Sequence, residues 1–300
     1  MHSTIMIFID GVGIGKSNPE VNPFIKYHFN SFGKVFGAVP TLDNQYLTSN
    51  DKYLFPVDAC MGIDDLPQSG TGQTSIFTGT NAPEIVGHHF GPYPHSKTID
   101  TLKSKNIFKE FLGRNLKVTF ANAYPKIFFD YVNSGRRRLS ATSLCCIYSG
   151  VKLKSSTDLR RGKALSAEID NKRWVEMLNY NLPIIKPRTA ARRLFRLAKE
   201  NHFTLFEYFF TDHIGHGRYP ELFAYVMKTL DEFLFYILTN LPGDISLVIC
   251  SDHGNLEDIS VKSHTRNPAL GITAGKNAAE LSRKIKYLYD IKPSIMEMHD

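Results

Sequence analysis

The chain has 300 residues, which is enough for one large domain or two modest ones. Hydrophobic residues make up 42% of it and charged residues 22%, as in ordinary soluble globular proteins with a sizeable core. No run approaches the roughly 18 apolar residues of a membrane span, and no segment has the pattern of a signal peptide. We therefore expect a cytoplasmic protein without a membrane partner.

The formal net charge of +7 comes partly from short basic clusters at residues 136–138, 160–161 and 188–196. Such clusters either form a solvated basic face or line a site that binds anions. No nucleic-acid-binding module surrounds them, so nucleic acid is not expected as a partner. The four cysteines lack the spacing of a metal finger and are predicted to be reduced, buried thiols.

Strand-like and helix-like patterns alternate along the chain. Strands are predicted at residues 5–9, 117–121, 203–210 and 245–250, and helices at residues 189–201 and 220–241. This alternation is typical of βαβ units. The sequence thus predicts an α/β fold in which a mostly parallel sheet lies between helices.

The middle of the chain is less regular. Residues 84–186 are rich in Gly, Pro, Ser and Arg and contain the only tryptophan, Trp174. We interpret them as partly core and partly a small cap, inserted into an α/β core that residues 1–83 and 187–300 form.

An aspartate follows each of three predicted strands. Asp10 follows residues 5–9 and precedes glycines, Asp212 follows residues 203–210, and Asp252 follows residues 245–250. Ligands of open α/β sheets bind outside the carboxyl ends of the strands. These three carboxylates are therefore expected to face one crevice.

Histidines accompany two of these aspartates. His216 stands four residues after Asp212, so one helical turn would place both on the same side; the alternative is a helix cap beside a surface histidine. His253 is adjacent to Asp252, and His264 follows on the next loop. Three carboxylates and three histidines suit two divalent cations about 4 Å apart, a geometry that clamps a phosphoryl group. Such mixed ligands suit zinc or manganese.

A nucleophile is predicted within residues 66–79. Glycines and small polar residues there precede an apolar turn, as expected for a loop that enters a helix. A helix N-terminus stabilises both an alkoxide and a phosphate group. Ser69, Thr71 and Thr74 all carry a hydroxyl group in this stretch.

Taken in order, these motifs resemble the alkaline phosphatase superfamily. They are the strand-end Asp-Gly, a Ser ten residues before the Gly of a Thr-Gly pair, Asp-x-x-x-His, Asp-His-Gly-Asn and His-Thr-x-Asn-Pro. The last two, at residues 252–255 and 264–268, are most similar to the branch that contains cofactor-independent phosphoglycerate mutase and phosphopentomutase. The matching motifs cover residues 5–80 and 205–270.

The resemblance implies two divalent metal ions, Zn²⁺ or Mn²⁺, and a phosphoserine intermediate on Ser69. Its register, ten residues before Gly79, favours Ser69 over Thr71 and Thr74. The ligand sets that it implies are Asp212, His216 and His264 for one ion, and Asp10, Asp252, His253 and Ser69 for the other.

Departures from the family pattern narrow the expected activity. The stretch between Gly79 and Asp212 is too short for a full second mutase domain, which favours a hydrolase acting on a small anionic phosphate ester. A phosphomutase or a phosphodiesterase of the same superfamily is the alternative, and a catalytically silent binding protein is the alternative outside enzymes. Sulfatase chemistry is not expected, because Thr71 and Gln73 replace the Pro and Arg that it requires.

Two further sets of residues have both a functional and a structural interpretation. His89, Arg136 and Arg138 are candidate substrate contacts, or else ordinary surface side chains of loops. Gly15-Lys16-Ser17 resembles the end of a phosphate-binding P-loop, but Asp10 occupies the position of its first glycine and would repel a phosphate. The P-loop interpretation also leaves the histidines without a role.

Overall fold

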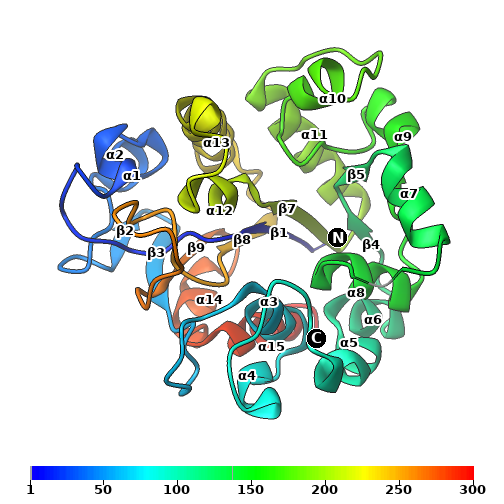
Figure 1. Ribbon diagram of the computed structural model, residues 1–300, viewed down its shortest axis with the longest axis horizontal. Coiled ribbons are helices and arrows are strands. Elements are labelled where there is room, and N and C mark those ends of the chain that lie inside the picture. Colours follow the sequence, from blue (N-terminus) through cyan, green and yellow to red (C-terminus); the bar gives the residue numbers. More distant parts are fainter. Residues whose placement is uncertain (1, 137) are drawn as a thin grey trace.

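The structure is a computed structural model that describes residues 2–136 and 138–300. Its centre is a seven-stranded sheet in the order β2-β3-β9-β8-β1-β7-β4, and β5 and β6 form a separate pair (Figure 1). The strands are β1 (Ser3–Ile9), β2 (Leu47–Ser49), β3 (Lys52–Val57), β4 (Val118–Phe120), β5 (Ala123–Tyr124), β6 (Lys154–Ser155), β7 (Phe203–Tyr208), β8 (Ile245–Cys250) and β9 (Ala269–Gly275).

Helices cover both faces of this sheet (Figure 1). The α-helices are α1 (Pro23–Lys26), α2 (Asn30–Phe36), α3 (Ser69–Thr78), α4 (Ala82–Val86), α5 (Ile99–Lys105), α6 (Ile107–Gly113), α7 (Lys126–Asn133), α8 (Ala141–Ser149), α9 (Ser156–Arg160), α10 (Lys172–Glu176), α11 (Pro187–Glu200), α12 (Phe210–Gly215), α13 (Phe223–Asn240), α14 (Ala278–Lys284) and α15 (Ile291–Glu297). Short 3-10 turns are η1 (Ser96–Thr98), η2 (Pro220–Leu222) and η3 (Leu288–Asp290).

The prediction of a parallel sheet between helices is confirmed for the centre of the molecule. Strands β8, β1, β7 and β4 all run parallel, and Ile7 of β1 lies opposite Phe206 of β7 and Ile249 of β8. The other edge differs, because β2, β3 and β9 pair in antiparallel fashion. The parallel centre is what brings the carboxyl ends of β1, β7 and β8 to one edge of the sheet.

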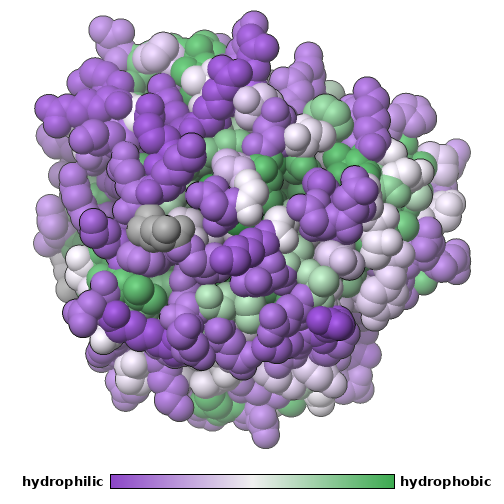
Figure 2. Space-filling model, turned by 180° about the vertical axis from the view of Figure 1, so that it is seen from behind, coloured by the Kyte–Doolittle hydropathy of each residue, from purple (hydrophilic) through white to green (hydrophobic). Residues whose placement is uncertain are grey.

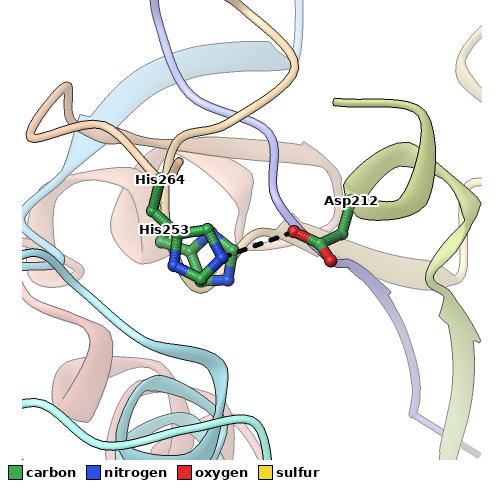
Figure 3. A group of neighbouring side chains, drawn as sticks. All are labelled: Asp212, His253 and His264. Atoms are coloured by element: carbon green, nitrogen blue, oxygen red, sulfur yellow. Dashed lines mark ion pairs between the residues drawn. The ribbon is translucent and has the colours of Figure 1, made fainter. Parts of the chain in front are cut away.

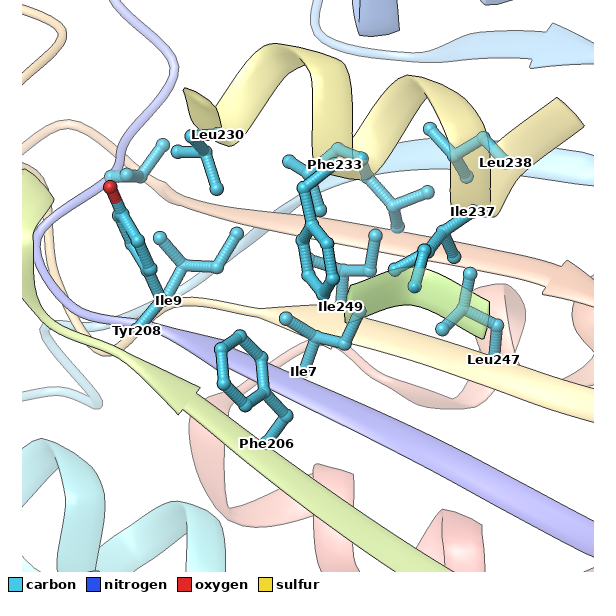
Figure 4. Close-up of a cluster of buried hydrophobic side chains, with 14 of the residues drawn as sticks. Ile7, Ile9, Phe206, Tyr208, Leu230, Phe233, Ile237, Leu238, Leu247 and Ile249 are labelled. Carbon is cyan, nitrogen blue, oxygen red and sulfur yellow. The ribbon is translucent and has the colours of Figure 1, made fainter. Parts of the chain in front are cut away.

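Alternation along β1 builds the two halves of the core. Ile5, Ile7 and Ile9 pack into the cluster beneath α11 and α13, whereas Met6 and Phe8 pack on the opposite face against α3, α6, α8 and α15. All of these side chains are buried, as expected for a parallel strand covered on both faces. Figure 4 shows side chains of α13 lying across β1, β7 and β8.

Residues 84–186 contribute to two layers. Helices α5, α6 and α8 pack on the sheet, and β4 extends it. The pair β5-β6 lies outside the sheet, next to a small cluster made by Ala123, Leu159, Ala164, Trp174 and Leu182. We refer to the described part of residues 121–186, apart from α8, as the cap layer, and its role as a cap stays a prediction.

Surface features agree with a chain of mixed polarity. Hydrophilic side chains dominate the view from behind, with smaller hydrophobic patches between them (Figure 2). Within the described residues, no helix is long and apolar enough to cross a membrane. The cysteines are unpaired thiols; Cys145, Cys146 and Cys250 are buried, whereas Cys60 is half-buried.

Candidate metal centre

The three aspartates reach one edge of the sheet by different routes. Asp10 follows β1 directly, and its N–H donates to the carbonyl of Tyr208 at the end of β7. Asp252 follows β8 after one intervening residue. Asp212 differs from the strand-end position expected for it, since β7 ends at Tyr208 and Asp212 lies in the first turn of α12. The helix places His216 one turn further on, as its C-terminal cap.

Asp212, His216 and His264 form a compact group, here called group 1. His216 Nε2 lies 3.2 Å from Asp212 Oδ1 and 3.2 Å from His264 Nε2, and His264 Nε2 lies 3.5 Å from Asp212 Oδ1. Ligand atoms about 2.0–2.1 Å from a tetrahedral zinc ion lie about 3.3 Å from one another. The three atoms thus have the mutual spacing of ligands that share one cation.

Asp10, Asp252, His253 and Ser69 form the second group, here called group 2. His253 Nε2 lies 3.0 Å from Ser69 Oγ, 3.3 Å from Asp10 Oδ1 and 3.5 Å from Asp252 Oδ2. His253 and Asp252 are fully buried, whereas Asp10 and Ser69 line the cavity described below. Its spacing also suits a single cation.

The two groups are side by side. The rings of His253 and His264 stack with their centroids 3.7 Å apart. Asp212, His253 and His264 offer ligand atoms within 4.8 Å of one another. Figure 3 shows both imidazole rings beside the Asp212 carboxylate, which comes from α12 while the histidines come from the loops after β8.

Backbone carbonyls orient the histidines of the centre. Nδ1 of His216 lies 2.6 Å from the carbonyl oxygen of Lys262, and Nδ1 of His264 lies 2.6 Å from that of Pro67. A carbonyl only accepts hydrogen bonds, so Nδ1 of each ring carries the proton. Nε2 of each ring faces Asp212: in the neutral ring it offers a lone pair, as in metal-binding histidines, and in the metal-free protein a second proton there lets the ring donate to the carboxylate.

The pKa shifts of the clustered aspartates indicate that the centre needs compensating positive charge. Burial raises the pKa of Asp10 well above its usual range, and the carboxylates of Asp252 and Asp212 raise it further. Burial acts in the same direction on Asp212, but hydrogen bonds with His216 and His264 outweigh it and hold the pKa of Asp212 well below its usual range. Three clustered carboxylates repel one another unless cations compensate them.

Unsatisfied oxygens support the same conclusion. Asp10 Oδ1, Gln73 Oε1 and Asn255 Oδ1 are buried and accept no hydrogen bond. Buried acceptors without a donor are rare in folded proteins and often mark a site for an ion or water. The donor set and these oxygens therefore fit divalent cations.

Side chains outside the predicted ligand sets hold the ligands in place. Gln73 Nε2 donates to Asp10 and Asp252 at 3.2 and 3.3 Å, and Asn255 Nδ2 donates to Asp212 at 2.8 Å. Asn255 belongs to the Asp-His-Gly-Asn motif, whereas Gln73 sits inside α3 and gave no signal in the sequence.

The buried Glu257 joins three loops around the centre. It accepts hydrogen bonds from the N–H groups of Gly13 and Asn255 at 2.9 and 2.7 Å, and from Nδ2 of Asn267 at 3.0 Å. It thereby ties the loop after β1 to both loops after β8. In the sequence, only the proximity of Glu257 to the Asp-His-Gly-Asn motif indicated that it belongs to the centre.

Ser69 is the first residue of α3, as the sequence predicted for the nucleophile loop. Close packing there requires glycine, because a Cβ on Gly70 would lie 2.1 Å from the carbonyl oxygen of Tyr93. Two residues further on, a Cβ on Gly72 would lie 3.0 Å from the Asp252 side chain. The two glycines let the start of the helix approach both the loop at Tyr93 and the carboxylates.

The three hydroxyl candidates have different surroundings. Ser69 lines the large cavity described below. Thr71 is fully buried and hydrogen bonds with the carbonyl of Gln68 and the N–H of Phe90. Thr74 is also fully buried and donates to the carbonyl of Gly70 at 2.7 Å. Only Ser69 among the three is a lining residue of the cavity.

A cavity of about 720 Å³ opens above the centre. Its floor contains residues of both groups, and its walls include aromatic and basic side chains. The wall residues used below are Tyr93, Tyr124, Phe128, Tyr131, Arg138, Glu207, Phe209 and Arg218. Small-molecule sites commonly have this size and this mixture of aromatic and polar walls.

The three candidate substrate contacts have different positions. Arg138 lines the cavity. Arg136 is not among the lining residues, and its guanidinium lies over the ring of Tyr131, 5.4 Å from the centroid. His89 is buried behind the start of α3, where Nε2 lies 3.0 Å from the carbonyl oxygen of Cys60. The cavity wall also includes Arg218, which the sequence analysis did not select.

Glu207 is a further acidic residue of the cavity that the sequence analysis missed. It lies on β7, one residue before the strand ends, and accepts a hydrogen bond from Thr142 at 3.1 Å. Burial raises the pKa of Glu207 to about 7. The sequence did contain a signal for Glu207, since it is a single glutamate inside the largely apolar run 203–210. Burying a charge in a strand costs free energy, so such a residue indicates a function.

Comparison with known proteins agrees with this geometry. Residues 178–300, which contain group 1 and the ligands that follow β8, match the model of the metalloenzyme superfamily. This match, over part of the chain, supports a metalloenzyme of the alkaline phosphatase superfamily. The match supports enzymatic activity and the binding of divalent metal, and it does not separate a hydrolase from a mutase.

Solved structures share the fold of this chain over nearly its whole length. A protein from Pyrococcus horikoshii aligns with a TM-score of 0.58 and 14% identity, over 99% of this chain and 96% of the other. The alkaline phosphatase from the Antarctic bacterium TAB5 aligns with a TM-score of 0.52 and 12% identity, over 98% of this chain and 97% of the other.

A cold-active alkaline phosphatase from a psychrophilic Shewanella species gives a TM-score of 0.51 at 10% identity, over 98% of this chain and 99% of the other. Identities this low establish the fold alone. No curated protein matches the sequence.

Proposed function

We propose that the protein is a phosphoric ester hydrolase that acts through a phosphoserine intermediate on Ser69. The observation that carries this proposal is the position of Ser69 Oγ, which lies at the start of α3, on the cavity floor, 3.0 Å from His253 Nε2. A nucleophile needs an oxygen that the substrate can reach, next to groups that favour its ionised form. Ser69 lines the cavity and lies beside His253, which supports both features.

The proposed reaction has two displacements at phosphorus. In the first, Ser69 Oγ loses its proton and bonds to phosphorus, the bond between phosphorus and the ester oxygen breaks, and the alcohol leaves with that proton. In the second, water attacks the phosphoserine, the bond between Oγ and phosphorus breaks, one proton of the water returns to Oγ, and inorganic phosphate is released. The N-terminal N–H groups of α3 are placed to stabilise negative charge on the phosphoryl oxygens in both steps.

Groups 1 and 2 would each hold one divalent cation, Zn²⁺ or Mn²⁺. When bound, two such ions supply positive charge that neutralises the transferring phosphoryl group. The chain itself contributes the arrangement: backbone carbonyls fix the histidine rings, and Gln73 and Asn255 orient the carboxylates. Because these side chains are already oriented before the substrate binds, they need no rearrangement during the reaction, and electrostatic stabilisation of the transition state is then effective.

The cavity walls favour a small anionic substrate. Arg138 from the cap layer and Arg218 after α12 both line the cavity, and arginine pairs well with phosphate or carboxylate oxygens. Aromatic side chains such as Tyr93, Tyr131 and Phe128 provide apolar surface for the alcohol part. The cap layer is short, and we therefore favour hydrolysis over the phosphomutase and phosphodiesterase alternatives.

An assay with p-nitrophenyl phosphate tests this function. We expect phosphate release by the enzyme loaded with Zn²⁺ or Mn²⁺, loss of release after dialysis against EDTA, and recovery when the same ion is returned. The reason is that the three clustered carboxylates bind substrate phosphate poorly without cations. The measurement is the rate of p-nitrophenol release with each ion.

Two results would contradict the hydrolase. Interconversion of 2- and 3-phosphoglycerate without release of free phosphate would instead establish a mutase. Metal binding without turnover of any phosphate ester, including a phosphodiester substrate, would indicate a catalytically silent binding protein.

A further inference from the structure

A second groove lies between α9 and α11, away from the metal centre. It has a volume of about 290 Å³ and shares no lining residue with the large cavity. Five of its seven lining residues are arginines. The lining residues are Arg160, Arg161, Gly162, Thr189, Arg192, Arg193 and Arg196.

Helix spacing gathers these side chains from two elements. On α11, Thr189, Arg192, Arg193 and Arg196 stand three or four residues apart and thus share one face. The end of α9 brings Arg160 and the next residue, Arg161, to the same groove.

Gly162 allows the close approach of the two elements. It has a φ of +66°, and a Cβ built on it would lie 3.2 Å from Arg196 and 3.3 Å from Arg193 side-chain nitrogens. A larger residue would therefore be strained in its backbone and would push both guanidinium groups away.

Neutral groups hold the guanidinium groups in position. Arg196 donates to the carbonyl of Gly162 at 2.5 Å, and Arg193 donates to that of Leu159 at 3.5 Å. Arg192 Nε donates to the hydroxyl of Tyr236 at 2.8 Å, and its guanidinium lies over the same ring. Each of these bonds occupies one of the five N–H donors of a guanidinium.

No carboxylate within the described part of the chain forms an ion pair with any of these five arginines. Five like charges around one groove repel one another and give it a strongly positive potential. Burial lowers the pKa of Arg193, and the charge of Arg196 lowers it further. The groove therefore has fixed donors and an uncompensated positive charge.

We propose that this groove binds a small molecule with two or more phosphate groups. Guanidinium forks pair with phosphate oxygens in a bidentate manner, and arginines on two elements can contact more than one phosphate. The volume lies near the lower end of small-molecule pockets, which favours a compact ligand over a nucleic-acid duplex. The proposal does not depend on the activity at the metal centre.

Calorimetric titration with inorganic pyrophosphate tests the proposal on the full-length, metal-loaded protein. The test variant is Arg160→Gln with Arg161→Gln, because both side chains are exposed and their replacement leaves the bonds from α11 to α9 intact. The matched control is Arg188→Gln with Arg283→Gln, which removes the same net charge from exposed positions outside the groove. All three proteins keep the catalytic cavity, so binding there cancels in the comparison.

We expect the test variant to bind pyrophosphate at least roughly tenfold more weakly in the groove, as loss of charge-assisted contacts implies, and the control to match the wild type. Equal titrations for all three folded proteins would overturn the proposal. The proposal would also be wrong if the test variant bound pyrophosphate as the wild type does but no longer bound single-stranded RNA or anionic phospholipid vesicles. That result would show that the groove is part of a surface that binds a macromolecule. Turnover of p-nitrophenyl phosphate by the test variant reports separately on the metal centre.

Discussion

Ser69→Ala is expected to lower kcat for phosphate esters by roughly 10⁴-fold or more, as loss of a covalent nucleophile does in other enzymes. The reason is that Oγ is the atom that bonds to phosphorus, and no other hydroxyl of α3 lines the cavity. Both metal ions should remain, because Asp10, Asp252 and His253 still form a three-residue site. Steady-state kinetics with metal analysis of the same sample measure both effects.

Thr74→Ala is the matched control for this variant. It removes a hydroxyl from the same helix, but one that is buried and donates to the carbonyl of Gly70. Its expected effect is a loss of about 1 kcal/mol in the free energy of unfolding, with kcat close to that of the wild type. A Ser69→Ala enzyme that turns over normally, or a Thr74→Ala enzyme that is folded and inactive, would show that the assignment of the nucleophile is wrong.

Asp252→Asn is expected to remove one of the two bound metal ions and to lower kcat/KM by more than about 100-fold. Mutation of a residue that only hydrogen bonds to a metal ligand costs up to about 100-fold, and loss of a ligand itself should cost more. Asparagine keeps the volume and the oxygen that accepts from Gly11 N–H, but it loses the charge. The Asp252 charge also raises the pKa of Asp10, so the metal-free variant should be no less stable than the metal-free wild type. Metal analysis, kinetics and thermal melting measure these three effects.

Asp244→Asn provides the control at the opposite end of the same strand. Asp244 is exposed and immediately precedes β8, whereas Asp252 follows it. This variant should keep two metal ions and full activity. Retention of both ions by Asp252→Asn would show that group 2 does not bind metal as proposed.

The sequence was most informative where local pattern and three-dimensional structure coincide. The runs 5–9 and 245–250 are strands because uninterrupted apolar residues suit a sheet buried on both faces. The aspartates that follow them reach one edge because parallel neighbours end at the same side. The antiparallel edge was not predicted, since β2 is short and β9 contains small residues with little strand preference.

Other features depend on contacts between distant segments. The aromatic residues Phe209 and Phe210 continue the strand pattern of residues 203–208, yet α12 begins at Phe210 and carries Asp212 into the centre. Tertiary packing there outweighs local preference. Gln73 and Glu257 gain their roles only when α3 and the loops after β1 and β8 meet, so no local motif could identify them.

Mass spectrometry of enzyme quenched in acid during turnover tests the central claim most directly. A phosphoserine survives acid, and peptide mapping locates the added phosphoryl group. The account predicts one phosphoryl group on Ser69 in the wild type and none on α3 in Ser69→Ala. A phosphoryl group on Thr71 or Thr74, with Ser69 unmodified, would contradict it.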